Sequence, residues 1–198
     1  MINKIVIFAS GGGTNFISIY KNIVESKIKN TMISLLVSNN PKSGAVEFAK
    51  MNNIETFIAN KKIYPSNKKY NKTLIDKLTN VSPRLIVLAG YMKLIPQEVI
   101  SLFKNRIINI HPGKLPEFGG KGMYGLNVHK AVIKNRQKYT AVSIHYVNER
   151  YDEGKIIHEQ RIRVLEDDTP ESLSDRVLNY EHKIYSVVIN NLLNERYN

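Results

Sequence analysis

The sequence predicts an α/β fold, with a Rossmann-like, mostly parallel sheet flanked by helices, a late antiparallel hairpin and a long C-terminal helix. Three observations support this prediction. Short continuous apolar runs such as Ile5–Ala9 and Leu85–Ala89 are typical of parallel strands buried on both faces. Helical patterns follow these runs repeatedly along the chain. Late in the sequence, Thr140–Val147 alternates apolar and polar residues and precedes a second strand-like segment, as in a hairpin.

The first strand is predicted at Ile5–Ala9, and the glycines Gly11–Gly13 end its apolar run. A helix is then expected over Thr14–Glu25. Met32–Val37 predicts the second strand. Its following helix is expected over Pro41–Met51, with proline at the opening turn, where the backbone needs no N–H donor.

The middle of the chain repeats this alternation. Ile54–Ile58 predicts the third strand, and Lys69–Leu78 predicts a helix whose apolar positions form one buried face. Leu85–Ala89 is the next buried strand, which Gly90 ends. A short helix is expected over Pro96–Phe103.

The last part of the chain supplies the hairpin and the long helix. Ile107–Ile110 predicts a fifth strand, and an irregular glycine-rich segment separates it from a helix at Leu126–Lys134. The segments Thr140–Val147 and Lys155–Val164 are expected to pair across a loop. The terminal helix is predicted over Pro170–Leu193.

The composition limits the classes of function. The 198 residues are expected to form one domain, residues 1–198, with enough chain to bury a core. The absence of cysteine excludes disulfides, thiolate nucleophiles and Cys-based metal sites, and it fits a reducing, cytoplasmic location. No apolar segment is long enough to span a membrane, so we expect no membrane partner.

The net charge of +12 has two interpretations. It favours either an acidic partner, such as nucleic acid or an anionic substrate, or a compositional bias of the whole chain. The lysines are scattered rather than gathered in one block, and no basic face interleaved with aromatic residues is visible. We therefore expect no nucleic-acid partner and attribute most of the charge to composition.

The segment Ser10–Asn15 is the first candidate site. Three glycines between a buried strand and a helix allow a ligand to approach the backbone, and the helix N-terminus favours an anion such as phosphate. The alternative is a tight turn without a ligand. Phe16 stands where a dinucleotide motif has its third glycine, and no Gly-Lys-Ser/Thr follows, so a phosphorylated metabolite fits better than NAD or ATP.

A second candidate site combines Asn109, His111 and Asp152. Asn109 and His111 are two residues apart at a strand end, so their side chains face the same way. The amide can stabilise a developing oxyanion, the imidazole can move a proton, and a nearby carboxylate would raise the imidazole pKa. The alternatives are a surface histidine and ordinary turn chemistry at Asp152. The remaining histidines lack metal-site spacing and are expected in structural or surface roles; they are His129, His145, His158 and His182.

Taken in order, these segments resemble a known family. Ser-Gly-Gly-Gly-Thr-Asn after the first strand, Leu-Ala-Gly-Tyr-Met after the fourth, Asn109-Ile-His-Pro with Leu-Pro, and Asp152-Glu-Gly are similar to motifs of the phosphoribosylglycinamide formyltransferases. The resemblance covers nearly the whole chain and implies the formyltransferase fold. It also implies transfer of a formyl group from the co-substrate 10-formyltetrahydrofolate to the amine of glycinamide ribonucleotide in purine biosynthesis, without a metal.

The resemblance further implies a role for each matching residue. Asn109 would bind the formyl oxygen, His111 would donate a proton and Asp152 would raise the pKa of His111. Glu181 would contact the amine end of the ribonucleotide. The phosphate would be held by Gly13, Thr14 and Asn15, and the folate by Met92, Lys93, Leu94, Ile95, Asn109 and either Asn67 or its neighbour Lys68.

Three other functions stay open at this point. A formyltetrahydrofolate deformylase uses the same Asn, His and Asp set but transfers the formyl group to water, and it usually carries a regulatory domain before the first strand. A methionyl-tRNA formyltransferase needs an added β-barrel. A basic nucleic-acid-binding module would leave the three motifs unexplained. The expected partners are small-molecule substrates, and the expected assembly is a monomer or a weak homodimer.

Overall fold

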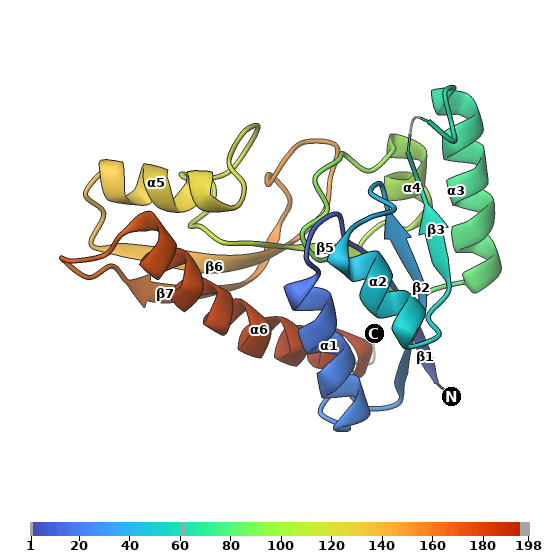
Figure 1. Ribbon diagram of the computed structural model, residues 1–198, viewed down its shortest axis with the longest axis horizontal. Coiled ribbons are helices and arrows are strands. Elements are labelled where there is room, and N and C mark those ends of the chain that lie inside the picture. The colour runs from blue at the N-terminus through green and yellow to red at the C-terminus, as the bar shows by residue number, and fades with distance from the viewer. Residues whose placement is uncertain (1, 61, 195–198) are drawn as a thin grey trace.

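The computed structural model describes residues 2–60 and 62–194, which form a seven-stranded sheet with the strand order β3-β2-β1-β4-β5-β6-β7 (Figure 1). The strands from β3 to β5 are parallel, whereas β6 is antiparallel to β5 and β7 is antiparallel to β6. The predicted mixed sheet with a late hairpin is confirmed. The strands are β1 (Asn3–Phe8), β2 (Thr31–Ser38), β3 (Thr56–Ile58), β4 (Leu85–Leu88), β5 (Ile107–His111), β6 (Tyr139–Tyr146) and β7 (Ile156–Arg163).

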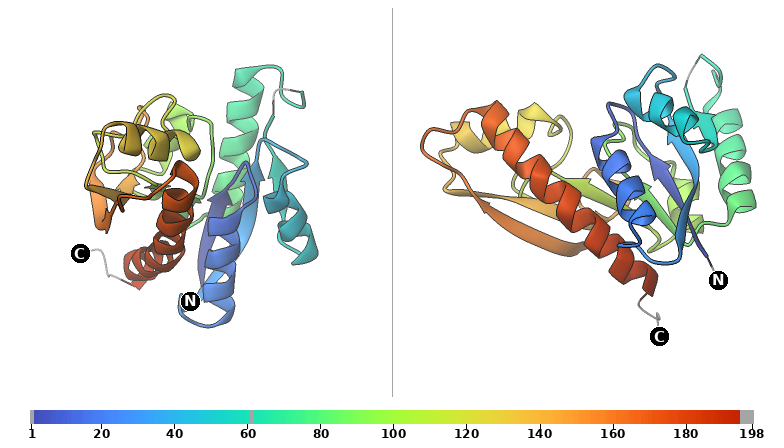
Figure 2. Two further views of the ribbon diagram at one scale, coloured as in Figure 1. Left: turned by 60° about the vertical axis from the view of Figure 1, so that its left-hand side comes forward. Right: turned by 60° about the horizontal axis from the view of Figure 1, so that its bottom comes forward.

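Within residues 2–60 and 62–194, six helices cover the two faces of this sheet. The helices α1, α2, α5 and α6 contribute side chains to one apolar core, and α3 and α4 contribute to the other. Figure 2 shows α6 crossing the strands next to α1. The helices are α1 (Thr14–Val24), α2 (Gly44–Met51), α3 (Asn67–Val81), α4 (Gln97–Leu102), α5 (Leu126–Lys134) and α6 (Pro170–Asn194).

The interior strand β1 explains why there are two cores. Successive side chains of a strand point to opposite faces, so Ile5 and Ile7 enter one core and Val6 and Phe8 enter the other. All four side chains are fully buried. This two-sided burial is the physical reason for the continuous apolar run in the sequence.

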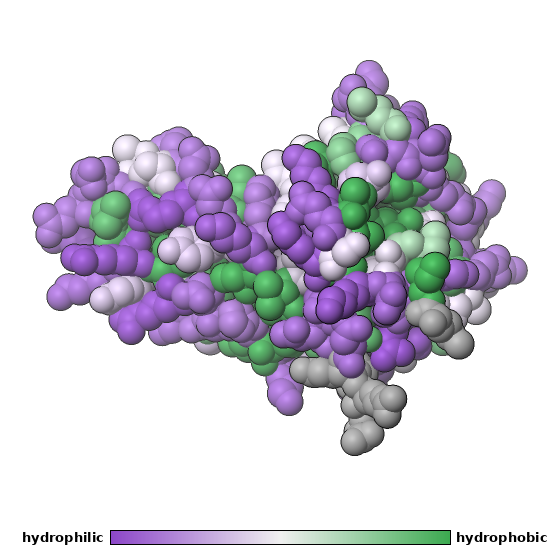
Figure 3. Space-filling model, turned by 90° about the horizontal axis from the view of Figure 1, so that it is seen from below, coloured by the Kyte–Doolittle hydropathy of each residue, from purple (hydrophilic) through white to green (hydrophobic). Residues whose placement is uncertain are grey.

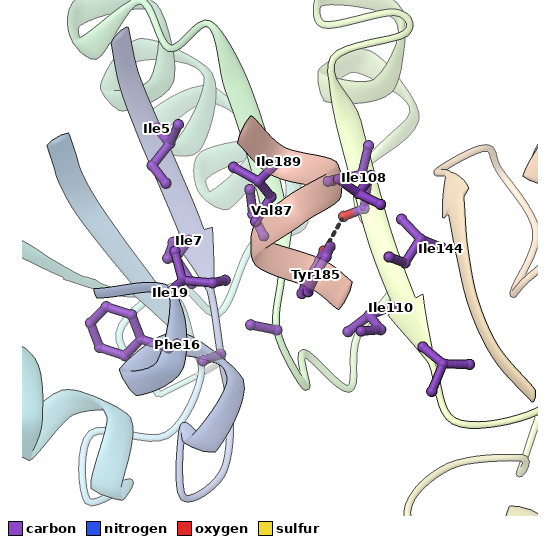
Figure 4. Close-up of a cluster of buried hydrophobic side chains, with 14 of the residues drawn as sticks. Ile5, Ile7, Phe16, Ile19, Val87, Ile108, Ile110, Ile144, Tyr185 and Ile189 are labelled. Atoms are coloured by element: carbon purple, nitrogen blue, oxygen red, sulfur yellow. Dashed lines mark hydrogen bonds between the residues drawn. The ribbon is translucent and has the colours of Figure 1, made fainter. Parts of the chain in front are cut away.

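The long helix α6 fixes the middle of the sheet. Its side chains Tyr185 and Ile189 lie among apolar side chains of β1, β4 and β5 (Figure 4). The buried hydroxyl of Tyr185 shares its one hydrogen between the carbonyl oxygens of Leu88, at 2.9 Å, and Ile108, at 3.3 Å. The helix therefore holds together the adjacent strands β4 and β5, next to the ends from which the candidate site residues project.

One predicted helix start is wrong. The helix α2 begins at Gly44, so Pro41 lies in the preceding turn and not in the opening helical turn. The cause is Ser43, whose side chain accepts a hydrogen bond from the Val46 N–H at 3.3 Å and caps the helix. The other predicted elements are present, with bounds that differ by a few residues at their ends.

The surface seen in Figure 3 is mostly hydrophilic, with apolar side chains in small separate patches. Among residues 2–60 and 62–194, no helix is both long enough and apolar enough to span a membrane.

Candidate active site

A cavity of about 430 Å³ opens at the carboxyl end of the parallel strands, lined by the start of α1 and by the segments that follow β4 and β5. Ligands bind at this position in open α/β sheets because the loops after neighbouring strands diverge there. The cavity is lined by ten of the predicted site residues, namely Thr14, Asn15, Met92, Lys93, Leu94, Ile95, Asn109, His111, Asp152 and Glu181.

Two predicted site residues do not line the cavity. Gly13 immediately precedes the lining residue Thr14 and forms the N-cap of α1. Asn67 is the exposed first residue of α3, and its neighbour Lys68 is also exposed and outside the lining. The structure therefore brings to the cavity neither Asn67 nor Lys68, one of which the resemblance assigned to the folate.

His111 is the last residue of β5, and its side chain is only 4% exposed. Its Nδ1 lies 3.6 Å from Oδ2 of Asp152, and its Nε2 lies 2.7 Å from the carbonyl oxygen of Phe118. A carbonyl oxygen only accepts hydrogen bonds, so Nε2 carries a hydrogen in this contact. Nδ1 is therefore the ring nitrogen at which His111 can gain or lose a proton.

Burial lowers the pKa of His111 below its ordinary value, because an imidazolium ion loses its hydration in the interior. The negative charge of Asp152 and the hydrogen bond to Phe118 raise the same pKa, but they do not offset burial. The predicted upward effect of Asp152 is thus present, although the net pKa shift is downward.

Asp152 is held by groups from three segments. Its Oδ2 accepts a hydrogen bond from the Gly120 N–H at 3.0 Å, and its Oδ1 accepts one from Nδ2 of Asn109 at 3.4 Å. Burial raises the pKa of Asp152, but the neighbouring His145, the charge of His111 and the hydrogen bond from the Gly120 N–H together lower this pKa by more. The net pKa is below the ordinary value, so the carboxylate is ionised near neutral pH.

The N-terminus of α1 forms one side of the cavity. Gly13 adopts φ 77°, and a Cβ atom there would lie 2.9 Å from Ala45, so only glycine fits this turn. The N-cap residue Gly13 has no side chain to cap the helix, so among the described residues the first backbone N–H groups of α1 have no side-chain cap. Thr14 and Asn15 line the cavity from this turn.

Asn15 and Glu181 join the start of the chain to α6. Nδ2 of Asn15 donates to Oε2 of Glu181 at 2.6 Å, although the two residues are 166 positions apart. Both side chains are buried. Burial raises the pKa of Glu181 to about 7, and the hydrogen bond from Asn15 opposes this shift only in part. Glu181 can therefore change its charge near neutral pH.

A family comparison agrees with this arrangement. A model of the formyl transferase family matches residues 3–189 of the chain. The chain belongs to the formyl transferase family.

Named relatives within this formyl transferase family come from plants and bacteria. The chain is 42% identical over 194 residues to the chloroplastic phosphoribosylglycinamide formyltransferase of Arabidopsis thaliana, with 98% of this chain and 66% of the relative covered. It is 34% identical to the Bacillus subtilis phosphoribosylglycinamide formyltransferase, with 97% and 95% covered. The chain thus spans about two thirds of the plant protein and nearly all of the bacterial one.

Solved formyl transferase structures confirm the predicted fold. The crystal structure of phosphoribosylglycinamide formyltransferase from Bacillus halodurans superposes with a TM-score of 0.89 at 32% identity, covering 98% of this chain and 96% of that one. A formyltetrahydrofolate deformylase from Pseudomonas syringae superposes with a TM-score of 0.79 at 19% identity, covering 98% of this chain and 60% of that one. At that identity the deformylase shares the fold, and the likeness supports no closer relation.

Two histidines in this formyl transferase site were assigned only structural or surface roles from the sequence. His145 lies opposite Asn109 in the β5–β6 pair, with its Nε2 3.2 Å from Nδ2 of Asn109 and 3.5 Å from Oδ1 of Asp152. His129 of α5 also lines the cavity, and burial lowers its pKa to about 4. The alternation of β6 places His145 on a defined face, but only the antiparallel register shows which residue it meets.

Within the described residues, no group of three or more His, Asp or Glu side chains has an arrangement that could hold a metal ion.

Proposed function

We propose that this formyl transferase moves the formyl group of 10-formyltetrahydrofolate to the amine of glycinamide ribonucleotide. The observation that carries the proposal is the meeting of an anion-binding helix N-terminus with the Asn109, His111 and Asp152 cluster in one cavity. The first feature suits the phosphate of the ribonucleotide, and the second suits attack on a carbonyl carbon. Relatives named phosphoribosylglycinamide formyltransferase support the choice of substrates.

The ribonucleotide would bind along the α1 and α6 side of the cavity. Its phosphate is placed at the free backbone N–H groups after Gly13, with Thr14 beside them. Glu181 lies in the same wall and is hydrogen-bonded to Asn15. A carboxylate there can bind the amine end of the nucleotide by charge, which orients the nitrogen toward the formyl donor.

The folate would bind beside the segment that follows β4. Met92 and Leu94 are 43% and 48% exposed, so apolar surface is available for an aromatic ring at the edge of the cavity. Lys93 and Ile95 line the same segment. The formyl carbon would then lie between the amine and the Asn109–His111 pair.

The reaction forms a bond between the amine nitrogen and the formyl carbon and breaks the bond from that carbon to N10 of the folate. Nδ2 of Asn109 and a proton on Nδ1 of His111 would stabilise the oxyanion of the tetrahedral intermediate. The amine, bound as its cation beside Glu181, gives one proton to water before it attacks. It loses a second proton afterwards, which N10 gains, and Nδ1 is the His111 atom able to exchange this second proton. Asp152 stabilises the imidazolium while this happens.

One assay tests the proposal against hydrolysis by a deformylase. The protein is incubated with 10-formyltetrahydrofolate, with and without glycinamide ribonucleotide, and release of tetrahydrofolate is followed by absorbance. Release that requires the ribonucleotide, with formylated ribonucleotide as the second product, supports the proposal. Equal release without the ribonucleotide would show that water is the acceptor and would refute it.

The same proposal extends to the domain organisation, assembly, partners and location of the protein. The chain acts as one domain over residues 1–198, as a monomer or weak homodimer, on small-molecule substrates without nucleic acid or membrane, in the cytoplasm. The lack of cysteine and the scattered lysines support these statements. Sedimentation equilibrium and a gel-shift assay with DNA and RNA test the assembly and the nucleic-acid partner.

A further inference from the structure

Ser10 lies where three loops meet. It belongs neither to the cluster of Asn109, His111 and Asp152 nor to the proposed phosphate-binding residues at the start of α1. It follows β1 at the point where the strand order reverses. Its hydroxyl donates to Oδ1 of Asn39 at 2.6 Å and accepts from the Met92 N–H at 3.3 Å. Its own N–H donates to the carbonyl oxygen of Gly90 at 3.1 Å. Ser10 thus connects the segments that follow β1, β2 and β4.

The hydroxyl of Ser10 has a defined direction. It has one hydrogen, which the short contact to Asn39 uses, so its lone pairs are left to accept from Met92. Asn39 therefore fixes the orientation of the hydroxyl, and the hydroxyl fixes the position of the Met92 backbone.

The segment Met92–Ile95 depends on this contact. It lies between β4 and α4 and belongs to no helix or strand. Within the described part of the chain, the Met92 N–H to Ser10 contact is the one hydrogen bond made by the backbone of this segment. The backbone groups of Lys93, Leu94 and Ile95 are left available to a ligand.

Ser10 also begins the turn that leads through the glycines to Gly13 and the N-terminus of α1. A ligand that orders this turn lowers the conformational freedom of Ser10. Since the same hydroxyl holds Met92, the ligand lowers the freedom of the folate-lining segment as well. The second ligand then loses less entropy on binding, which is positive coupling between the two subsites.

We infer that Ser10 is a positioning residue that couples the two substrate subsites, so that binding at the α1 N-terminus tightens binding beside Met92–Ile95. The coupling rests on the proposed function, because it requires that the ribonucleotide and the folate occupy these two places. The hydrogen bond between Ser10 and Met92 does not rest on that function, so it can be tested separately.

The first measurement concerns the ligand-free protein. Hydrogen exchange at the Met92 amide is followed by NMR in the wild type, Ser10→Ala and Asn39→Ala. Loss of one neutral hydrogen bond is expected to speed exchange roughly fivefold in Ser10→Ala, with a smaller increase in Asn39→Ala. Ser101→Ala, which changes an exposed serine at the end of α4, is the matched control and should leave the rate unchanged. Unchanged exchange in Ser10→Ala would overturn the inference.

The second measurement concerns coupling. The Kd of tetrahydrofolate is measured by calorimetry with and without saturating glycinamide ribonucleotide, a pair that cannot react. The wild type should bind tetrahydrofolate several-fold more tightly with the ribonucleotide, and Ser10→Ala should lose most of this ratio. Ser10→Thr keeps a hydroxyl and should restore it, which separates positioning from a loss of folding.

The outcomes are distinguishable. A Ser10→Ala variant that exchanges Met92 faster but keeps the wild-type coupling ratio would refute coupling through Ser10 and leave the proposed function standing. A wild-type protein that binds neither ligand would refute the proposed function and the coupling with it, whereas the exchange rates would still decide whether Ser10 holds Met92.

Discussion

The carboxylate of Asp152 faces the imidazole of His111, with 3.6 Å between Oδ2 and Nδ1. The opposite ring nitrogen of His111 is held by the carbonyl oxygen of Phe118. The two contacts orient the ring and leave Nδ1 as the atom that exchanges a proton next to a negative charge. The proposed reaction depends most directly on this pair.

Removing either partner of this pair should slow the reaction strongly. We expect His111→Ala and Asp152→Asn each to lower kcat by roughly a hundredfold or more, because one loses the proton donor and the other loses the charge that stabilises it. Steady-state kinetics with both substrates measure this.

The double variant provides the control. Because the two side chains act as one unit, the loss in His111→Ala/Asp152→Asn should be far smaller than the product of the single losses. Near-normal turnover in both single variants, or losses that multiply, would contradict the assigned pairing.

Gly119 sets the position of Asp152 by having no side chain. A Cβ atom at Gly119 would lie 2.5 Å from Cδ2 of Leu115 and 3.0 Å from Cβ of Asp152. We therefore expect Gly119→Ala to displace the carboxylate and to lower kcat by roughly tenfold or more, with a smaller change in KM. Gly122→Ala is a suitable control in the same loop, because a Cβ there has no neighbour within 4 Å and only the positive φ of 91° is strained. Equal losses in the two variants would show that a general disturbance of this loop, which lines the cavity at Gly122, and not displacement of Asp152, is responsible.

Glu181 should make ribonucleotide binding depend on pH. Its pKa is raised to about 7, and a cationic amine binds the ionised carboxylate. Lowering the pH through about 7 protonates Glu181, so the apparent KM for the ribonucleotide should rise by about tenfold per unit well below that pH. Glu181→Gln should have a high KM for the ribonucleotide that does not change with pH in this way. Glu166 is an exposed residue before α6, so Glu166→Gln should behave as the wild type. A wild-type KM that is flat between about pH 5.5 and about pH 8.5 would argue against this role of Glu181.

His129 should contribute to the loss of stability in mild acid. Its pKa is lowered to about 4 from 6.5, first by burial and then by the charge of His111. Between these values the unfolded chain binds a proton that folded His129 does not, so the free energy of unfolding falls as the pH falls from 6.5 toward about 4. Burial also lowers the pKa of His111 and His182, so both add to this fall in the free energy of unfolding. The raised pKa of Glu181 opposes the fall, because the folded protein then binds the extra proton.

Comparison of the wild type with His129→Gln isolates this contribution. Urea unfolding at several pH values should show a shallower decline in the variant, with an unchanged denaturant slope as the control for the unfolded state. Parallel pH dependences in the two proteins would rule out His129 as a source of the decline.

The sequence predicted the parallel strands well because their burial on both faces leaves a simple pattern. Ile5–Ala9 and Leu85–Ala89 are continuous apolar runs, and the structure places strands over both. The start of α2 was predicted less well. Proline at position 41 suits the opening of a helix, but the helix is capped by Ser43, and this cap depends on how the Ser43 side chain is oriented toward the Val46 N–H.

Within the site, residues next to strand ends were predictable, and contacts that depend on loop paths were not. Asn109 and His111 share a strand face by simple alternation. The contact of the Gly120 N–H with Asp152 joins two irregular loops, and that of His145 with Asn109 requires the register of an antiparallel pair. No local pattern encodes either of these.

The hydrogen bond between Asn15 and Glu181 has a consequence for how the protein is made. A ribosome releases Asn15 long before Glu181, so the growing chain carries the turn before α1 without the cavity wall that α6 supplies. The complete cavity forms only when α6 docks and Tyr185 binds the carbonyl oxygens of β4 and β5. Catalysis would then begin in a single late step of folding, and recovery of turnover in a refolding experiment would report the docking of this helix.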